Sequence, residues 1–154
     1  TFFVNQHAGF GIIYRYQFSD FGIWAQIKSM TGTKEVLSTI EGKETITAAS
    51  LGMSYRWRPF QDPLSFSGQS HVIFSLGLES LQAKYRLTDT SIDETDTATD
   101  QYLVALGTYY MPLRSGFWLS FGLGYSPSSY TYEDLGIEAN NSRISYRLGV
   151  SYGF

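Results

Sequence analysis

The sequence predicts an all-β protein, an antiparallel up-and-down barrel that spans a membrane. Large apolar residues alternate with Gly, Ser and a few charged residues over several long stretches. A period of two is the pattern of a β-strand whose two faces meet different surroundings. No window has helical periodicity, and aromatic residues reach 17% of the chain. Together these observations favour membrane strands over the strands of an ordinary globular domain.

Composition narrows the functional classes. The 154 residues are enough for one domain with a substantial core. Charged residues make up only 16% and the net charge is −3, so the sequence has no nucleic-acid footprint. Cysteine is absent, which excludes disulfides and thiolate metal sites. No apolar run is long enough for a membrane helix. Membrane barrels stay possible because polar lumenal residues interrupt their apolar ones.

The alternation defines seven strands. The first two form a hairpin, because two alternating runs flank the turn-type pair Ser19-Asp20. Short turns are expected at 19–20 and 112–115, and the proline-containing connection 58–70 lies on the same side. Polar, acidic loops are expected on the other side, at 35–44, 88–100 and 132–141. The predicted strands, all in one domain over residues 1–154, are 8–18, 21–34, 45–58, 71–87, 101–111, 116–130 and 142–154.

The phase of the alternation changes once within a strand. Even-numbered residues from Val72 to Leu78 are apolar, but from Leu81 to Leu87 the apolar residues are odd-numbered. One interpretation is a β-bulge near Glu79–Ser80. The other is that the strand leaves the membrane there, so that Gln82 and its even-numbered neighbours face water. The sequence leaves both open.

The non-apolar face of the strands separates a membrane barrel from a soluble one. This face is mostly Gly, Ser and Gln with one or two cations per strand, too little charge for a solvent face. Small residues suit the interior of a narrow barrel, so a soluble lipocalin-like barrel is the weaker alternative. Aromatic residues near the predicted short turns indicate a girdle at one membrane interface. We expect it to contain Tyr14, Tyr16, Phe18, Phe21, Tyr55, Trp57, Tyr110 and Phe117.

The last ten residues, Ser-Tyr-Arg-Leu-Gly-Val-Ser-Tyr-Gly-Phe, carry a family resemblance. They resemble the closing strand of small bacterial outer-membrane barrels of the OmpA/OmpX/Ail type. The resemblance implies that the barrel-assembly machinery reads Leu148, Val150, Tyr152 and Phe154 as its signal. It also implies an outer-membrane location with a periplasmic C-terminus, extracellular loops, and outer-membrane lipid and lipopolysaccharide as surroundings. The hairpin pattern extends the likeness over residues 10–154.

The strand count departs from that family. Its barrels have an even number of strands, eight in this size class, whereas seven full strands are identifiable here. An open sheet would expose unpaired backbone groups to lipid at a cost of several kcal/mol each. We therefore expect a first strand that is missing from this sequence or supplied separately, including by another protein chain. A closed barrel with an odd number of strands is the alternative.

The alternation also predicts which polar side chains enter the barrel. Buried cations need carboxylates, water or an anion. We expect a rigid polar plug in which arginines pair with Glu79, Tyr109 and Gln26, and an anion-selective path is the alternative. The predicted interior cluster is Arg15, Gln26, Lys28, Arg56, Glu79, Arg143 and Arg147.

The sequence shows no recognisable set of catalytic residues. Neither histidine begins the His-x-Ser pair of the lipid A deacylases, because His7 is followed by Ala8-Gly9 and His71 by Val72-Ile73. His7 is expected on the surface of the outer rim. No group of residues has metal-ligand spacing. We expect a non-enzymatic scaffold or surface-interaction barrel without a cofactor. The alternatives are a narrow pore for small solutes or ions, a partner subunit of an envelope complex that supplies the missing strand, and a lipid-modifying enzyme.

Overall fold

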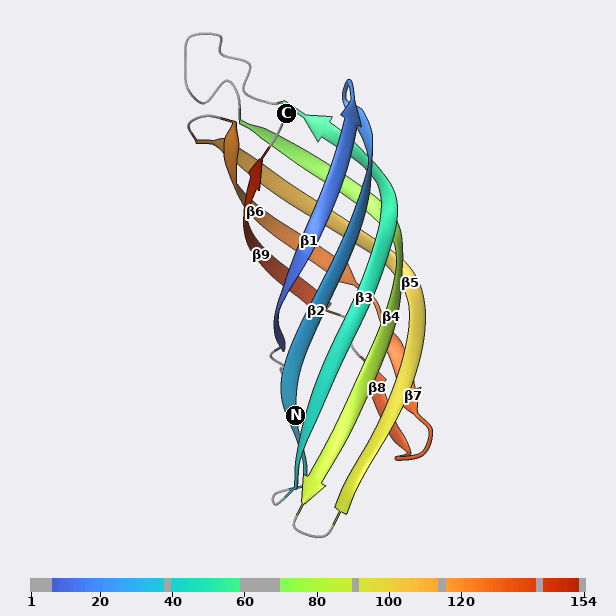
Figure 1. The fold of residues 1–154 in the computed structure, drawn as a ribbon. Helices are drawn as coiled ribbons and strands as arrows, with labels where there is room; N and C mark the ends of the chain where they lie inside the picture. The colour runs from blue at the N-terminus through green and yellow to red at the C-terminus, as the bar shows by residue number, and fades with distance from the viewer. Residues whose placement is uncertain are drawn as a thin grey trace.

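The computed structural model describes residues 7–37, 40–58, 70–89, 92–113, 116–140 and 143–152, and their regular structure is entirely β (Figure 1). No helix in these ranges is long and apolar enough to cross a membrane. The strands are β1 (His7–Phe18), β2 (Phe21–Leu37), β3 (Ile40–Trp57), β4 (His71–Asp89), β5 (Ile92–Pro112), β6 (Phe117–Ser126), β7 (Ser129–Tyr132), β8 (Ile137–Asn140) and β9 (Arg143–Tyr152).

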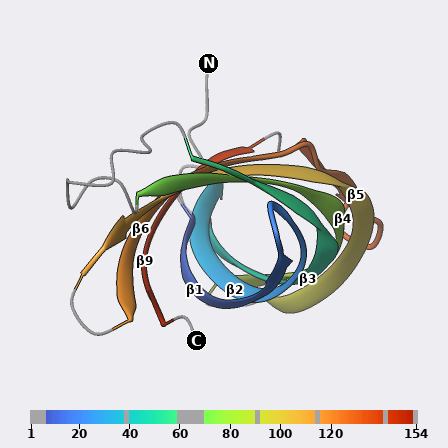
Figure 2. The ribbon, with the colours of Figure 1, turned by 90° about the horizontal axis from the view of Figure 1, so that it is seen from above.

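Seven strands form one antiparallel sheet in the order β1-β2-β3-β4-β5-β6-β9. The sheet curls into a half-barrel whose edge strands, β1 and β9, lie at its open side (Figure 2). Strands β7 and β8 pair separately as a small hairpin. The predicted all-β, antiparallel up-and-down architecture with seven long strands is therefore confirmed. We call the end with the β1–β2 turn the turn end, and the opposite end the hairpin end.

The predicted turn between the first two strands is confirmed. Phe18 pairs with Phe21, so Ser19 and Asp20 form a two-residue connection. Ser19 has φ 66°, in the left-handed region that two-residue hairpin turns require. The backbone carbonyl of Asp20 accepts a hydrogen bond from the Arg56 N–H at 2.6 Å, which ties the turn to the end of β3.

Two of the three predicted loops are wrong, because the sheet continues through them. Strands β2 and β3 pair up to Leu37 and Ile40, and β5 begins at Ile92, so segments 35–44 and 88–100 are mostly strand. From Thr95 to Asp100, a threonine stands at every second position of β5, and β-branched residues favour strands. Thr95, Thr97 and Thr99 are exposed on the convex face. The acidic composition hid this alternation.

The region predicted as the end of one strand and a third loop also differs. Strand β6 stops at Ser126, and β7 and β8 then form the small hairpin at the hairpin end (Figure 1). Carboxylates of β5 hold this hairpin by its backbone. The Asp96 carboxylate accepts hydrogen bonds from the N–H groups of Asp134 at 2.9 Å and Leu135 at 3.3 Å. Asp100 accepts one from Ser129 N–H at 2.9 Å.

Polarity changes along the length of the sheet. Towards the turn end, the convex face is an exposed apolar surface, which we call the belt. It consists of Phe10, Ile12, Tyr14, Tyr16, Phe18, Phe21, Ile23, Ile27, Leu51, Met53, Tyr55, Trp57, Phe74, Leu76, Leu78, Leu103, Met111, Phe117, Phe121, Leu123, Tyr125, Ile144, Tyr146, Leu148, Val150 and Tyr152.

Towards the hairpin end, the apolar residues lie on the concave side instead. There the inner faces of β3, β4 and β5 pack against the β7–β8 hairpin, and we call this region the cap. Its outer surface is polar, with exposed residues such as Lys43, Gln82 and Thr97. Its apolar core consists of Ile46, Ala48, Leu81, Ala83, Tyr85, Ala98, Tyr130, Tyr132 and Ala139.

The phase change in β4 marks the border between belt and cap. The pairing of β4 with β3 and β5 runs without a register shift through Glu79 and Ser80, which excludes a bulge. Leu78 is exposed on the convex face, whereas Leu81 is 2% exposed on the concave face. The strand keeps its geometry while the two faces exchange polarity.

Shortening a large side chain in the cap core should destabilise the fold strongly, because it leaves a cavity. We expect Leu81→Ala to lower the free energy of unfolding by about 2–5 kcal/mol, because it removes buried methyl groups and leaves a cavity. The matched control is Gln82→Ala, the next residue on the exposed face, which should change it by less than about 0.5 kcal/mol. Urea unfolding in detergent micelles measures both. Equal effects of the two variants would contradict the assignment of the cap core.

Candidate functional site

The first polar cluster surrounds Glu79 on the concave face. Lys28 Nζ lies 2.6 Å from Glu79 Oε1, and the two side chains are 10% and 0% exposed. Ser50 Oγ donates a hydrogen bond to Glu79 Oε2 at 2.6 Å, and Tyr102 OH donates one to Oε1. Four strands therefore supply one buried ion pair and its hydrogen bonds. Such a network fixes the relative positions of the strands that supply it.

The other predicted interior residues also point to the concave side, and one of the expected pairings, an arginine with Gln26, is present. Arg147 Nη1 donates a hydrogen bond to Gln26 Oε1 at 2.8 Å. The Arg15 guanidinium lies 5.5 Å from the centre of the Tyr110 ring. The expectation that arginines would pair with Glu79 is wrong, because Lys28 occupies that carboxylate.

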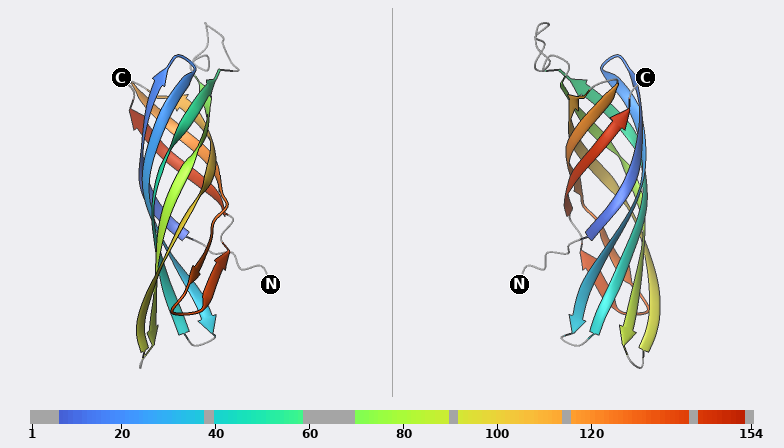
Figure 3. Two further views of the ribbon diagram at one scale, coloured as in Figure 1. Left: turned by 90° about the vertical axis from the view of Figure 1, so that its right-hand side faces the viewer. Right: turned by 60° about the vertical axis from the view of Figure 1, so that its left-hand side comes forward.

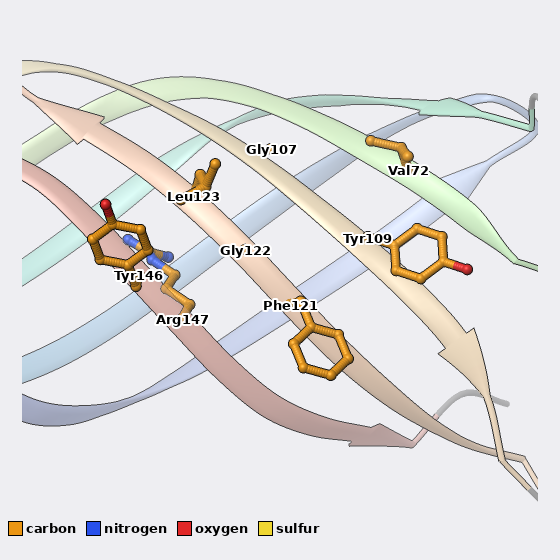
Figure 4. Close-up of a pocket in the computed structure, with 8 residues that line it drawn as sticks. All are labelled: Val72, Gly107, Tyr109, Phe121, Gly122, Leu123, Tyr146 and Arg147. Atoms are coloured by element: carbon orange, nitrogen blue, oxygen red, sulfur yellow. The ribbon is translucent and has the colours of Figure 1, made fainter.

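Tyr109 is not part of the interior cluster. It lies on the convex side with Phe121, where both line a shallow groove of about 450 Å³ (Figure 4). The groove passes over Gly107, whose lack of a side chain leaves the depression, and Leu123 and Tyr146 line its other side. Its lining is nearly all apolar, as expected of a surface within the belt.

Apolar side chains fill part of the interior next to the Glu79 cluster. Trp24, Val104 and Leu106 form a second buried cluster, with Trp24 only 1% exposed. The indole lies against Gly77, where an added Cβ would meet Trp24 Cζ2 at 2.7 Å. The Trp24 Nε1–H donates to the Met53 carbonyl at 3.1 Å. Bulky and small residues thus interdigitate inside the curled sheet.

The second polar cluster lies in the cap, around Glu44. His7 Nε2 is 2.6 Å from Glu44 Oε2, while Tyr130 OH and Tyr132 OH donate to Oε1 at 2.6 and 2.8 Å. Arg143 Nη2 lies 3.7 Å from Oε2, so Arg143 belongs here and not with Glu79. This carboxylate joins β1, β3, β7 and β9 at the hairpin end.

These contacts determine the acidity of Glu44. Burial alone would raise the pKa of Glu44, but hydrogen bonds from His7, Tyr130 and Tyr132 and the charge of His7 outweigh it and lower the pKa from 4.5 to about 2. Burial and the same hydrogen bonds raise the pKa of Tyr130 and Tyr132. Glu44 is therefore ionised and the tyrosines are neutral donors over the whole physiological range.

Both histidines have partners. The prediction of a surface position for His7 is wrong, since its side chain is 6% exposed and bound to Glu44. The His71 ring stacks on Tyr110 at 5.1 Å and meets the Trp118 ring edge-on at 5.0 Å. No group of three potential metal ligands occurs among the described residues.

One residue of the predicted aromatic girdle is misplaced. Tyr110 is 7% exposed and faces the interior beside His71, because even-numbered residues of β5 point inward. The other seven lie on the convex face, with exposures from 42% at Tyr55 to 68% at Tyr14. Phe117 packs on Tyr152 with ring centres 5.0 Å apart, and Phe21 packs on Tyr55 at 5.2 Å.

Three residues of the predicted assembly signal lie on β9, one of the two edge strands of the sheet. Leu148, Val150 and Tyr152 are exposed on the convex face of β9, at 75%, 69% and 54%. Phe154 lies outside the described residues. Comparison with protein-family models, curated proteins and solved structures finds no match to this chain.

Sequence reasoning missed the Glu44 cluster. The sequence-based prediction puts Glu44 in the loop 35–44, Tyr130 at the end of the strand 116–130 and Tyr132 in the loop 132–141, and it gives neither tyrosine a role. The alternation Gly42, Glu44, Ile46 continues the inward face of β3 and is the signal that could have revealed it. Nothing local could have identified the tyrosines as partners, because they are 86 and 88 residues away in sequence.

Because Lys28 and Glu79 form a buried ion pair, we expect the effects of substituting them on the folding free energy to be strongly coupled. We expect Lys28→Met and Glu79→Gln each to cost about 3–5 kcal/mol of folding free energy, because each leaves a buried charge without its partner. The double variant should cost less than the sum of the two, by about 1–3 kcal/mol. Urea unfolding of all four proteins measures the cycle. Simple additivity would show that the pair contributes no interaction energy.

The Glu44 cluster predicts a loss of stability in acid. Because the folded-state pKa lies near 2 and the usual value is 4.5, the contribution is complete above pH 4.5 and is lost as pH falls towards 2. We expect Glu44→Gln to remove this part of the pH dependence, and Tyr132→Phe to reduce it. Unfolding free energies between pH 6 and pH 2 measure the effect. An unchanged slope in Glu44→Gln would contradict it.

Proposed function

We propose that the chain is an integral outer-membrane β-barrel protein, a small non-enzymatic scaffold of the OmpA/OmpX/Ail type. The observation that carries the proposal is the exchange of polarity along β2 to β5. A belt of exposed apolar side chains ends at Leu78 and Leu103, and beyond them the same strands are polar outside and apolar inside. A sheet that crosses from lipid into water needs this exchange.

The dimensions of the belt support the proposal. Its alternating apolar residues run from Phe10 to Phe18 on β1, from Leu103 to Met111 on β5 and from Phe117 to Tyr125 on β6, nine residues each. A tilted strand needs about 9–11 residues to cross the hydrocarbon layer. A soluble barrel of the lipocalin kind would instead keep its large apolar residues on the concave face along its whole length.

The proposed orientation places the turn end in the periplasm and the cap outside the cell. The aromatic pairs Phe21–Tyr55 and Phe117–Tyr152 lie near the turn end, where a membrane–water interface favours aromatic rings. The apolar residues of β9 would be read by the barrel-assembly machinery. The polar outer surface of the cap would then lie beside the lipopolysaccharide head groups.

Interior packing favours a scaffold over a pore. The Glu79 network and Trp24 occupy part of the interior, and the cap core, which includes Tyr85, Tyr130 and Tyr132, packs at the hairpin end. These tyrosines lie against one another, with ring centres 5.4 and 5.6 Å apart. The proposed work of the protein is therefore to present the rigid cap surface to partners outside the cell. His7 and His71 serve packing and hydrogen bonding in this scheme.

In the proposed membrane location, a charged residue placed on the belt should destabilise the protein by an amount that depends on its depth in the bilayer. We expect Leu76→Arg, in the middle of the belt on β4, to destabilise the protein in lipid bilayers by about 2–4 kcal/mol. Gln82→Arg is the matched control on the same face of the same strand, but in the cap, and should have almost no effect. Denaturant unfolding from vesicles of outer-membrane lipid measures both.

A second measurement tests location directly. The chain expressed with a secretion signal should float with vesicles of outer-membrane origin, and quenching lipids should quench Trp57, which is 48% exposed on the belt. Recovery of the folded chain in the soluble fraction would contradict the proposed membrane location.

A further inference from the structure

The outer face of the cap carries three cations on two neighbouring strands. Lys43 on β3 and Lys84 and Arg86 on β4 are exposed. Lys43 lies directly opposite Arg86 in the register, and Lys84 is the next residue of β4 on the same face. Like charges directly opposite each other on a sheet are destabilising, so the folding of the sheet does not account for this arrangement. We call these three residues the basic wall.

The carboxylates of the neighbouring strands alternate with the outward-facing residues. Among the side chains that the structure describes in the hairpin-end halves of β3 and β5, the acidic ones have the parity of the concave face. They are Glu44, Glu94, Asp96 and Asp100. Glu44 is 3% and Asp96 7% exposed, and donors inside the cap occupy both carboxylates. Neither of these two can therefore neutralise a cation of the basic wall.

The β7–β8 hairpin exposes the opposite charge. Glu133, Asp134 and Glu138 are exposed on its outer side. Glu138 pairs with Thr131 in the register, and both side chains are exposed, whereas Tyr132 beside them belongs to the cap core. We call the three acidic residues the acidic face.

The basic wall and the acidic face lie at one level and point in opposite directions. Tyr85 of β4 and Tyr132 of β7 pack within the cap core with ring centres 5.4 Å apart. Because side chains alternate along a strand, Lys84 and Arg86 on either side of Tyr85 point out of the core. Glu133, next to Tyr132, points out on the other side. Both views of Figure 3 show the hairpin level with the hairpin-end halves of β3 and β4. The cap is therefore positive on one side and negative on the other.

The proposed membrane would align copies of the cap. All copies would stand upright with their belts at the same depth. A shift in the membrane plane then brings the basic wall of one copy against the acidic face of the next at equal height. Such a head-to-tail contact is heterologous and does not close, so it extends into rows. Exposed ion pairs are individually weak in solution, but a membrane that restricts tilt and depth raises the effective concentration of one face at the other.

We propose that the basic wall is a docking site for the acidic face of a second copy of the chain, upright in the same membrane. The inference rests on the proposed function, because the membrane sets the common height of the two faces. Phosphate groups of lipopolysaccharide are the competing anions at the wall, but they have no attraction to the acidic face. An interaction that requires both faces therefore identifies the second copy as the occupant.

Cross-linking between copies tests the contact. The chain contains no cysteine, so one chain can carry Thr45→Cys, opposite Lys84 in the register, and a second chain Thr131→Cys, opposite Glu138. Both are inserted together into phosphatidylcholine vesicles and oxidised mildly, and dimers are counted on a denaturing gel. We expect the mixture to yield disulfide-linked dimers and each chain alone about tenfold fewer, because like charges then face each other. Equal yields in all three samples would mean chance collisions and would overturn the proposal.

Charge reversal shows whether both faces are required. Lys43→Glu with Lys84→Glu in the first chain should lower the dimer yield about tenfold, because acidic residues then face each other. Glu133→Lys with Glu138→Lys in the second chain should lower it equally. Mixing the two reversed chains should restore the yield, because the charges of the two faces are exchanged. A loss that this exchange does not restore would contradict the proposed contact.

A control and two further measurements separate the alternatives. Arg58→Glu reverses an exposed charge at the turn end and should leave the dimer yield unchanged. Vesicles that contain lipopolysaccharide should give the same yield, and a loss there would show that phosphate occupies the wall instead of a second copy. Flotation of the same vesicles reports membrane insertion. Chains that float without cross-linking would overturn this inference alone, whereas chains that do not float would contradict the proposed membrane location.

Discussion

The exchange of polarity between the two faces of one continuous sheet governs the rest of the structure. Strands β2 to β5 keep an unbroken ladder, so a residue's face is fixed by its parity alone. Apolar side chains must then move from even to odd positions of β4 where the surroundings change. Leu78 and Leu81 stand on the two sides of that border. The belt, the buried ion pair and the cap core all follow from where the border falls.

Each of the two polar clusters surrounds a buried carboxylate with donors, one inside the belt and the other in the cap. Inside the belt, Glu79 is surrounded by a cation and two hydroxyls, so the curled sheet can bury charge without water. In the cap, Glu44 serves the β7–β8 hairpin, whose two tyrosines reach it from the far side of the core. Glu44 on β3 thus binds residues of β1, β7 and β9, none of which pairs with β3. Of the partners of Glu79, only Lys28 lies on a strand that does not pair with β4, because Ser50 and Tyr102 lie directly opposite Glu79 on β3 and β5.

Period-two alternation was enough to predict the sheet, its seven long strands and the face of most belt residues. The prediction failed where the surroundings of a strand change. Residues 88–100 resemble a loop in their acidic composition, although the threonines from Thr95 to Thr99 alternate as in a strand. It also failed at Tyr110, because large aromatic residues occur on both faces of β5. Partners such as Lys28 for Glu79 depend on register across strands, which a single sequence does not encode locally.

Part of the attachment of the β7–β8 hairpin does not depend on the hairpin's own side chains. Asp96 and Asp100 bind backbone N–H groups of the hairpin, and any residue except proline provides these. Its tip, residues 133–136, is largely exposed and contains the turn glycine Gly136. Foreign sequences could therefore be grafted at this tip for display on a fixed support.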